Sequence, residues 1–210
     1  RWAVRLLGDR NQVTAATAAE LARIAKSDPA AEVRSQLAAS AKRLPAGHAL
    51  PIVRALLARD EDAGDQHIPL LLWWAIESKA DTGREELITM LEDPALWKTK
   101  IFRQAIAERL GMRYAADQGP RKYYTLKQGV YSDWLIDRAP EHLRRNLEQC
   151  GRLLAAAPSE ADAALLLTGM AKGLTGPRVE GAPRQLHDVV AKLWNTAPRS
   201  AALVVLAAKL

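Results

Sequence analysis

The 210-residue sequence contains little of several residue types, and each scarcity excludes a class of protein. The single cysteine, Cys150, excludes an intrachain disulfide framework and any Cys-x-x-Cys metal or redox motif. The four histidines are dispersed, and none lies three or four residues from another, so no pair can bind a metal from one helix face. The longest apolar runs, 69–76 and 201–208, are about eight residues long, far short of the roughly 20 that a membrane-spanning helix needs.

The residues that are abundant favour helices. The chain has 39 Ala and 30 Leu but only 27 Val, Ile and Thr together. This balance is typical of helical proteins and argues against a β-sandwich or a barrel. Apolar residues also recur at helical spacing, as in the series Val33, Leu37, Ala41 and Leu44.

Turns containing Pro, Gly or Asp separate these helical segments. We expect Thr17 with Glu20 to form a capping box, and Asp28 to cap the helix that follows it. About ten helices of about 10 to 15 residues alternate with the turns, at pair spacings of about 28 to 40 residues. The sequence therefore predicts an all-α fold, a HEAT- or armadillo-like α-solenoid of antiparallel helix pairs. A compact multi-helix bundle is the alternative.

Charge is banded along the chain. The formal net charge is +6, but residues 60–95 carry 2 basic and 10 acidic side chains, whereas 96–127 carry 8 and 2. Gly119-Pro120 and Gly129 interrupt the helical pattern after the basic band begins. We therefore expect HEAT-like repeats in 1–116, an aromatic and basic insertion or long loop in 117–140, and further repeats of the same solenoid in 141–210.

The 117–140 insertion concentrates aromatic and basic residues. Aromatic side chains can stack on bases and cations can bind phosphates, so this pattern is compatible with nucleic-acid binding. The alternative is that the aromatics pack on the solenoid or on a neighbouring domain, because the acidic band before them would repel a phosphate backbone along the array. The candidate partner-binding residues of the insertion are Arg121, Lys122, Tyr123, Tyr124, Lys127, Tyr131 and Trp134.

Trp73 and Trp74 are further candidates for partner binding, because tryptophan is a common interface anchor. Neighbours on a helix point about 100° apart, so we expect at least one of the two in the core. Cys150 lies on an apolar stripe with Leu147 and Leu154, and we expect a buried, unreactive thiol.

The acidic segment 60–65 resembles a calcium loop, and Asp60, Asp62 and Asp65 are weak metal-ligand candidates. Asp65 stands where an EF-hand has its glycine, and Leu71 stands where it has its bidentate glutamate. The alternative is an acidic turn in which Asp65 begins the next helix, where its charge complements the helix dipole.

Three stretches of the chain resemble a known family. The resemblance covers about residues 1–115 and is strongest in Ile68-Pro69-Leu70-Leu71-Leu72-Trp73-Trp74. With Arg1–Asp9 and Glu32–Ala41, this string is similar to the HEAT-repeat segment of the large PVC-type haem-binding CxxCH proteins. In that family a dehydrogenase-like β-propeller usually precedes the helical repeats and a c-type cytochrome segment follows them.

The resemblance implies that the chain is a segment of a larger, exported or periplasmic protein that carries haem c. It implies no cofactor here, because haem attachment needs Cys-x-x-Cys-His and Cys150 is followed by Gly151-Arg152-Leu153. The chain also opens and closes inside helical patterns, so we expect a piece of something longer; a complete protein would be cytoplasmic.

No nucleophile elbow, phosphate loop or nucleotide fingerprint is present, so no catalytic residue is assigned. We expect a non-catalytic scaffold whose partners are other domains of the same parent chain or a separate protein. A basic HEAT-like nucleic-acid-binding domain is the alternative. A HEAT-like hydrolase acting on damaged bases is a minor third hypothesis.

Overall fold

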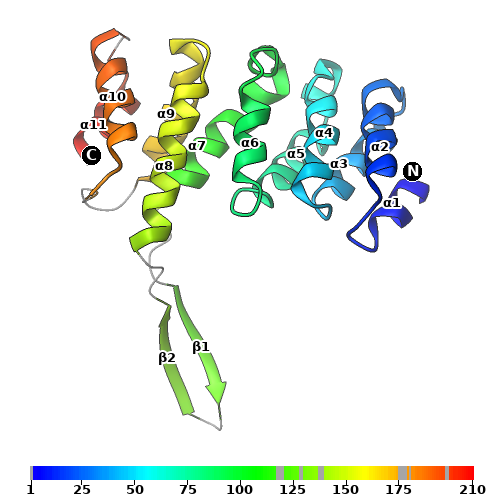
Figure 1. Cartoon of the computed structure of the whole chain (residues 1–210), viewed down its shortest axis with the longest axis horizontal. Helices are drawn as coiled ribbons and strands as arrows, with labels where there is room; N and C mark the ends of the chain where they lie inside the picture. Colours follow the sequence, from blue (N-terminus) through cyan, green and yellow to red (C-terminus); the bar gives the residue numbers. More distant parts are fainter. Residues whose placement is uncertain are drawn as a thin grey trace.

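The computed structural model describes residues 2–116, 121–127, 130–136, 140–174, 179, 181–196 and 199–210, with backbone only for 121–142. These residues form eleven α-helices, three short helical segments and one β-hairpin, so the predicted all-α class is confirmed for everything except the hairpin. Figure 1 shows the helices side by side along the long axis, with the two termini at opposite ends.

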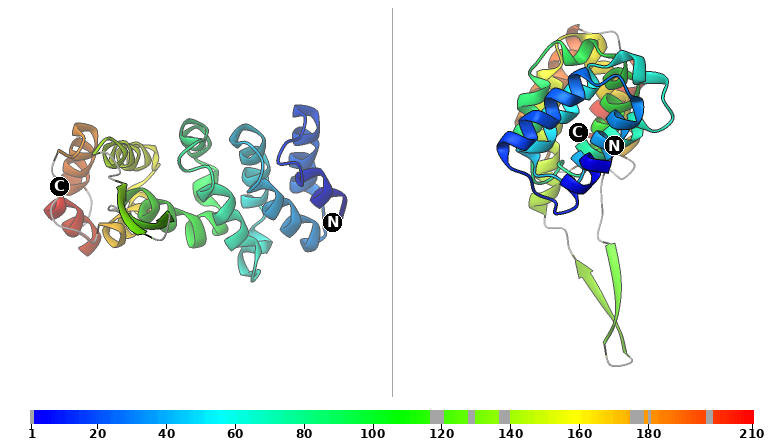
Figure 2. Two further views of the ribbon diagram at one scale, coloured as in Figure 1. Left: turned by 90° about the horizontal axis from the view of Figure 1, so that it is seen from below. Right: turned by 90° about the vertical axis from the view of Figure 1, so that its right-hand side faces the viewer.

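The helices form two rows. The odd-numbered row consists of α1 (Trp2–Gly8), α3 (Ala31–Ala41), α5 (Ile68–Glu77), α7 (Ala107–Ala115), α9 (Glu160–Gly173) and α11 (Ala201–Lys209). The even-numbered row consists of α2 (Ala15–Ser27), α4 (Ala46–Leu57), α6 (Arg84–Leu91), α8 (Pro140–Ala156) and α10 (Arg184–Thr196). Each odd helix contacts the next odd helix, and each even helix contacts the next even helix. Both rows are visible end to end in Figure 2.

Three short segments complete the links from the even row to the odd row. The 3-10 helix η1 (Asp60–Gly64) precedes α5, and the 3-10 helix η2 (Leu96–Lys98) follows α6. The π-helical segment η3 (Phe102–Ile106) leads directly into α7. The last residues of α1, α3, α5 and α7 lie about 33 to 38 residues apart, within the range of helical-repeat proteins. The interval from the end of α7 to the end of α9 is longer by about the length of segment 117–139.

The hairpin lies inside that longer interval. Strand β1 (Arg121–Lys127) pairs antiparallel with β2 (Val130–Ile136), and Tyr123 is the Cα partner of Trp134. In Figure 1 the two strands extend away from the edge of the helical rows where α7 gives way to α8. The expected insertion therefore contains a β-hairpin in addition to its connecting residues.

The core lies between the two rows. Leu37, Ala41 and Leu44 of the expected apolar stripe are at most 1% exposed, and Val33 packs at its margin. Trp97 lies edge-on to Phe102 at a ring distance of 4.9 Å. The Trp97 indole Nε1 donates to the Leu91 carbonyl at 2.8 Å. Buried aromatic rings therefore fill the junction where the π-helical turn enters α7.

Two of the expected helix caps are wrong, by three residues at α2 and by two residues at α3. Thr14, not Thr17, caps α2, and its hydroxyl accepts the N–H of Thr17. Glu20 instead pairs with Arg23 on the exposed helix surface. Asp28 accepts the N–H of Ala30, and α3 begins at Ala31. Local turn chemistry therefore identified the right segments but not the exact residue at which each helix starts.

Helices α7 and α9 approach so closely that only glycine fits between them. A Cβ added to Gly169 would lie 1.8 Å from the Glu108 carbonyl oxygen, and one added to Gly111 would lie 2.3 Å from the Leu166 carbonyl oxygen. Backbone at this distance leaves no room for any side chain. This joint is therefore the tightest helix contact among the glycine positions that the structure describes. Within the described residues, no helix is both long and apolar enough to cross a membrane.

Candidate interaction surface on the odd-numbered helices

Exposed large hydrophobic side chains are confined to one row of helices. Among the residues whose side chains the structure describes, all eight of them lie on odd-numbered helices. They are Trp2, Leu6, Leu7, Leu70, Trp74, Met112, Val204 and Val205. Scattered single apolar residues on a surface need no explanation, but their confinement to one row does. The odd row is therefore the candidate interaction surface.

Helix α5 is the central element of this surface. Its two adjacent tryptophans separate as expected: Trp73 is 8% exposed and belongs to the core, whereas Trp74 is 42% exposed. Leu70, one turn before Trp74, is 40% exposed. His67, Leu70 and Trp74 follow each other at i, i+3 and i+7, so they share one face of the helix. The Lys42 ammonium lies 5.7 Å from the centre of the Trp74 ring, so this face points toward the end of α3.

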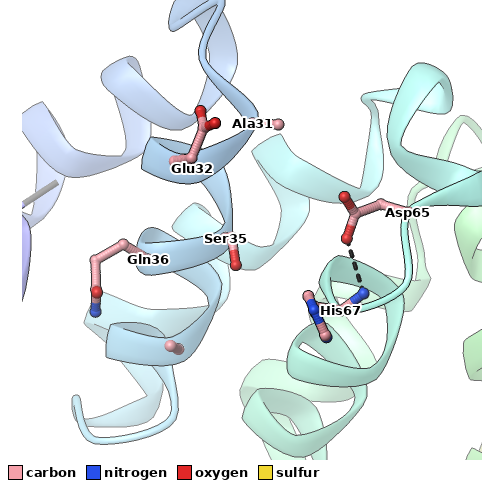
Figure 3. Close-up of a pocket in the computed structure, with 7 residues that line it drawn as sticks. Ala31, Glu32, Ser35, Gln36, Asp65 and His67 are labelled. Carbon is pink, nitrogen blue, oxygen red and sulfur yellow. Dashed lines mark hydrogen bonds between the residues drawn. The ribbon is translucent and has the colours of Figure 1, made fainter.

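A pocket of about 380 Å³ lies between α3 and the start of α5. Figure 3 shows Glu32, Ser35 and Gln36 on α3 opposite Asp65 and His67. The remaining lining residues are Ala31 and Ala39. Two carboxylates and no lysine or arginine line this pocket.

Basic side chains lie close together where α3 and α5 end. The Lys79 ammonium is buried and donates to the Lys42 carbonyl oxygen at 2.8 Å, and the Ser78 hydroxyl donates to the same oxygen at 3.2 Å. Burial lowers the pKa of Lys79, and the nearby Lys42 charge lowers it further. Among the described side chains, neither Glu32 nor Lys42 has an ion-pair partner. Acidic side chains therefore line the pocket at the start of α5, and basic side chains lie near the ends of α3 and α5.

The three acidic residues proposed as metal ligands have separate partners. Asp60 accepts the backbone N–H of Lys100 at 2.7 Å, and Lys100 lies between η2 and η3. Asp65 accepts the N–H groups of His67 and Ile68, both at 2.8 Å, and so caps α5. Asp62 pairs with Arg34. Within the described residues, no three His, Cys, Asp or Glu side chains are grouped to hold a metal. The structure therefore does not bring these three carboxylates together.

Asp65 makes a testable contribution to stability. The backbone N–H of Ile68 and then that of His67 hold the pKa of Asp65 below its usual value of 3.8. A depressed pKa in the folded state means that the ionised cap stabilises the fold above the unfolded pKa, and that this stabilisation is lost as the pH falls through the folded pKa. We expect Asp65→Ala to cost about 1 kcal/mol at pH 7, with the deficit shrinking below pH 3.8. Urea titrations of both proteins across this pH range measure it; a deficit that is constant with pH contradicts the assignment.

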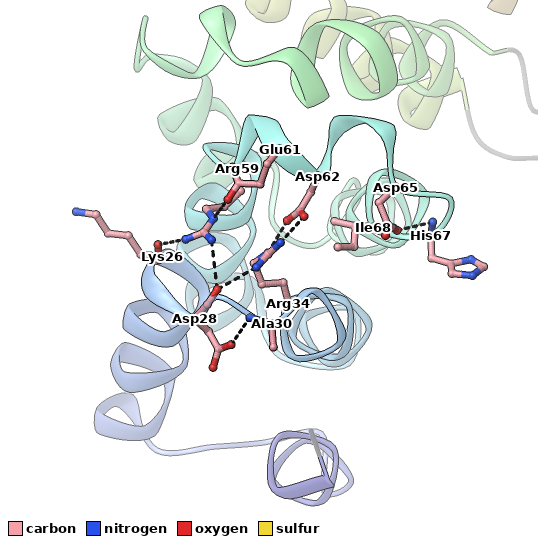
Figure 4. Close-up of polar contacts among 10 residues, drawn as sticks. All are labelled: Lys26, Asp28, Ala30, Arg34, Arg59, Glu61, Asp62, Asp65, His67 and Ile68. Atoms are coloured by element: carbon pink, nitrogen blue, oxygen red, sulfur yellow. Dashed lines mark hydrogen bonds and ion pairs between the residues drawn. The ribbon is translucent and has the colours of Figure 1, made fainter.

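Figure 4 shows that Asp62 belongs to a structural network instead. The Arg34 guanidinium donates from Nε and Nη2 to the two Asp62 oxygens at 2.6 and 2.5 Å. It also donates from Nη1 to the Asp28 carbonyl at 3.0 Å. Arg59 donates to the backbone carbonyls of Lys26 and Asp28. These contacts join the α2–α3 turn to the α4–α5 link, and the hydrogen bond to Asp62 raises the pKa of Arg34.

Cys150 is buried, as expected. Burial in the apolar interior raises the pKa of its thiol to about 12, so almost none of it is thiolate at neutral pH. We expect the thiol to resist alkylation by iodoacetamide at pH 8 in the folded protein and to react at once in guanidinium chloride. Mass spectrometry of timed samples measures both rates, and equal rates would show that the thiol is accessible.

The candidate partner-binding residues of the insertion lie on the two strands of the hairpin. Arg121, Lys122, Tyr123, Tyr124 and Lys127 are on β1, and Tyr131 and Trp134 are on β2. The antiparallel register places Tyr124 opposite Asp133 and Leu126 opposite Tyr131. The basic residues that the structure describes within the insertion therefore lie on β1. The orientation of these side chains lies outside what the structure describes.

Sequence reasoning missed the pocket between α3 and α5 and the contact of Lys42 with Trp74. The His67, Leu70 and Trp74 stripe was visible in the i, i+3, i+7 spacing, but apolar residues all around α5 hid it. Lys42 and Glu32 gave no signal, because only the packing of α3 beside α5 places Lys42 over Trp74 and Glu32 in one pocket with Asp65.

Comparison of the chain with models of protein families, with curated proteins and with solved structures finds no match.

Proposed function

We propose that this chain is a non-catalytic, HEAT-like α-solenoid scaffold that binds a protein partner along its odd-numbered row. The two rows of like-to-like helix contacts support a solenoid, because each helix pair buries its apolar face on its neighbours rather than around one common centre. This arrangement leaves one long face of each row open to a partner.

One observation carries the proposed binding role: all described large hydrophobic residues that are exposed lie on the odd row. The even row instead exposes charged residues such as Arg23, Arg54 and Glu86. Tryptophan is enriched at the energetic centres of protein interfaces, and Trp74 is the exposed tryptophan nearest the middle of the described array.

Site-specific photo-crosslinking tests the proposal. A photoreactive residue replaces Trp74 on α5 or, as the control, Thr89 on the exposed face of α6. We expect a specific adduct in extracts of the source cells only from the α5 position. The purified partner should then bind the Trp74→Ala variant at least about tenfold more weakly, the loss typical of an interface anchor. Equal cross-linking from both rows would contradict the proposal.

The resemblance of residues 1–115 supports a place for the scaffold within a larger exported, c-type-haem-containing dehydrogenase-like protein. The partner on the odd row would then be another domain of the same chain. The parent reading frame tests this: a signal peptide upstream and a Cys-x-x-Cys-His motif downstream support it. An initiator codon directly before Arg1 with a stop codon after Leu210 would overturn it.

A second candidate function is nucleic-acid binding through the hairpin. Its support is the concentration of Arg121, Lys122 and Lys127 on one strand, with Tyr123 paired to Trp134. If lysine and arginine contacts to phosphates dominate, the affinity should fall steeply as the salt concentration rises. If bases stack on the aromatic side chains, the affinity should depend little on the nucleotide sequence. Fluorescence anisotropy with labelled single- and double-stranded DNA measures binding. No binding at low salt, or binding unchanged in an Arg121→Ala/Lys122→Ala/Lys127→Ala variant, would exclude this function.

A further inference from the structure

We propose that a pocket on the even-numbered row, between α2, α4 and η2, binds a partner peptide through one large apolar side chain with an acidic residue beside it. The pocket lies on other helices than the odd-row surface, so the proposal goes beyond the function proposed above and does not depend on it. It follows from three observations: a cavity of about 520 Å³, small apolar residues in its walls, and an excess of positive charge around it.

Small apolar residues form most of the walls. Six of the eleven lining residues are alanine, proline or leucine, and they come from three separate segments: Ala22 of α2, Pro51 and Ala55 of α4, and Ala95 and Leu96 at η2 are among them. Leu96 is 3% exposed and belongs to the core, so the pocket reaches the apolar interior. Its volume lies within the range of about 300 to 1,000 Å³ typical of binding pockets. Walls of alanine therefore leave space that a large apolar side chain of a partner can fill.

The spacing along α2 and α4 explains how an apolar surface and a cation share this pocket. Pro51 and Ala55 are four residues apart, and Ala58 follows three residues later, so they lie on one face of α4. Ala22 and Lys26 are also four residues apart, so the lysine lies one turn beyond the alanine on the same face of α2. The apolar face of α4 therefore has a cation beside it, on the neighbouring helix.

Positive charge exceeds negative charge around the pocket. Three cations and one carboxylate line it: Arg23, Lys26, Arg54 and Asp93. The Asp93 carboxylate already accepts the backbone N–H of Ala95 at 3.0 Å and pairs with Arg54. Arg23 pairs with Glu20 on the exposed surface of α2, a kind of contact that contributes little to stability. The carboxylate of the pocket is therefore neutralised within it, and the excess charge is positive.

Lys26 supplies the cation that a partner can use. Among the side chains that the structure describes, its ammonium has no ion-pair partner. The backbone carbonyl of Lys26 accepts a hydrogen bond from Arg59 at 2.6 Å, which ties down the end of α2. Figure 4 shows the Lys26 side chain extending away from the contacts of Arg34 and Asp62. A carboxylate next to the apolar group that fills the pocket would pair with this ammonium without breaking an existing ion pair.

Titration of short peptides tests the proposal. The probe is Ala-Glu-Phe-Glu-Ala with both ends blocked, and glutamate on each side of the phenylalanine allows either peptide direction. Matched control peptides replace both glutamates by lysine, or the phenylalanine by serine. We expect the probe to bind at least about fivefold more tightly than either control, and to shift the amide resonances of Ala22, Ala55 and Ala95 in heteronuclear NMR spectra. Equal affinity for the three peptides, or shifts confined to other helices, would overturn the proposal.

Variants of the protein give a sharper test. Lys26→Glu should weaken binding of the probe at least about fivefold and reverse the preference in favour of the lysine peptide. Ala95→Trp places a large ring at an exposed position of the wall, so it should weaken binding of the probe by at least about fivefold by filling the pocket.

The matched control is Lys192→Glu on α10, which changes the net charge by the same amount at an exposed position outside the pocket. It should leave the affinity for the probe unchanged. Circular dichroism checks that each variant is folded. An effect of Lys192→Glu as large as that of Lys26→Glu would show that only the overall charge matters, and the pocket would not be the binding site.

This proposal and the proposed function fail separately. If photo-crosslinking from Trp74 captures a partner but the probe does not bind, the pocket on the even row is not a binding site and the odd-row function stands. If Lys26→Glu weakens binding of the probe but Trp74 captures nothing, the pocket stands and the odd row is not an interaction surface.

Discussion

Replacing Gly169 by alanine should destabilise the protein by about 3 kcal/mol or more, because overpacking a closely packed joint forces backbone to move. The added Cβ would lie 1.8 Å from the Glu108 carbonyl oxygen and 2.8 Å from the Met112 nitrogen. Both are backbone atoms of α7, so no side-chain rotation can relieve the clash. Helix α9 would have to move away from α7 at this position, where buried residues of both helices pack. Urea denaturation followed by circular dichroism measures the change.

The same substitution elsewhere serves as a control. Gly47 lies in the first turn of α4, and a Cβ added there meets nothing within 4 Å. Gly47→Ala should stabilise the protein by up to about 1 kcal/mol, because alanine has the higher helix propensity and loses less backbone entropy on folding. Gly111→Ala should destabilise like Gly169→Ala, since its Cβ would lie 2.3 Å from the Leu166 carbonyl oxygen. A small effect at Gly169 would show that α7 and α9 are not in close contact in solution.

Removal of one partner of the Arg34–Asp62 pair should cost about 3 to 5 kcal/mol, the range for an unpaired charge left in the interior. Both side chains are only 5% exposed, and the two hydrogen bonds are 2.5 and 2.6 Å long. In Asp62→Asn the guanidinium keeps its charge and loses its counterion. In Arg34→Met the carboxylate is left unpaired, and the contact to the Asp28 carbonyl is lost as well.

A double variant separates the charge penalty from the loss of the pair itself. Arg34→Met/Asp62→Leu removes both charges, and we expect it to be less destabilised than either single variant, because two buried ions are no longer desolvated. The exposed pair of Arg23 and Glu20, with 66% and 52% exposed side chains, is the control. Glu20→Ala should change stability by about 0.5 kcal/mol or less. Additive costs in the buried double variant would contradict the coupling inferred from the structure.

Much of the helical body could be predicted from periodicity. The stripe of Leu37, Ala41 and Leu44 is buried as expected, and Trp73 and Cys150 lie in the core. These predictions succeed because a residue's position on an amphipathic helix depends on spacing alone. Helix starts were less accurate, as Thr14 and Ala31 show, because several polar residues near a helix start can each serve as a cap.

Contacts between residues far apart in the sequence could not be predicted in the same way. The acidic segment was a reasonable cation-site candidate until the structure placed Arg34 beside Asp62, a residue 28 positions away. The Gly169 and Gly173 spacing, and that of Ala107, Gly111 and Ala115, was a readable sign of close helix packing. The sequence did not show which helices pack against each other, because the spacing of small residues on one helix does not identify the helix that contacts it.

By itself the sequence determined that this chain is helical, that its helices recur at a repeat-like interval, and that an aromatic and basic segment interrupts them between α7 and α8. Local propensity and periodicity are sufficient for those conclusions. Only the tertiary structure decided that exposed hydrophobic residues gather on the odd row, that α7 and α9 meet at glycines, and that Lys42 lies over Trp74 while Glu32 and Asp65 line one pocket. The physical reason is that each of these features joins residues from different helices, and their proximity depends on how the rows pack.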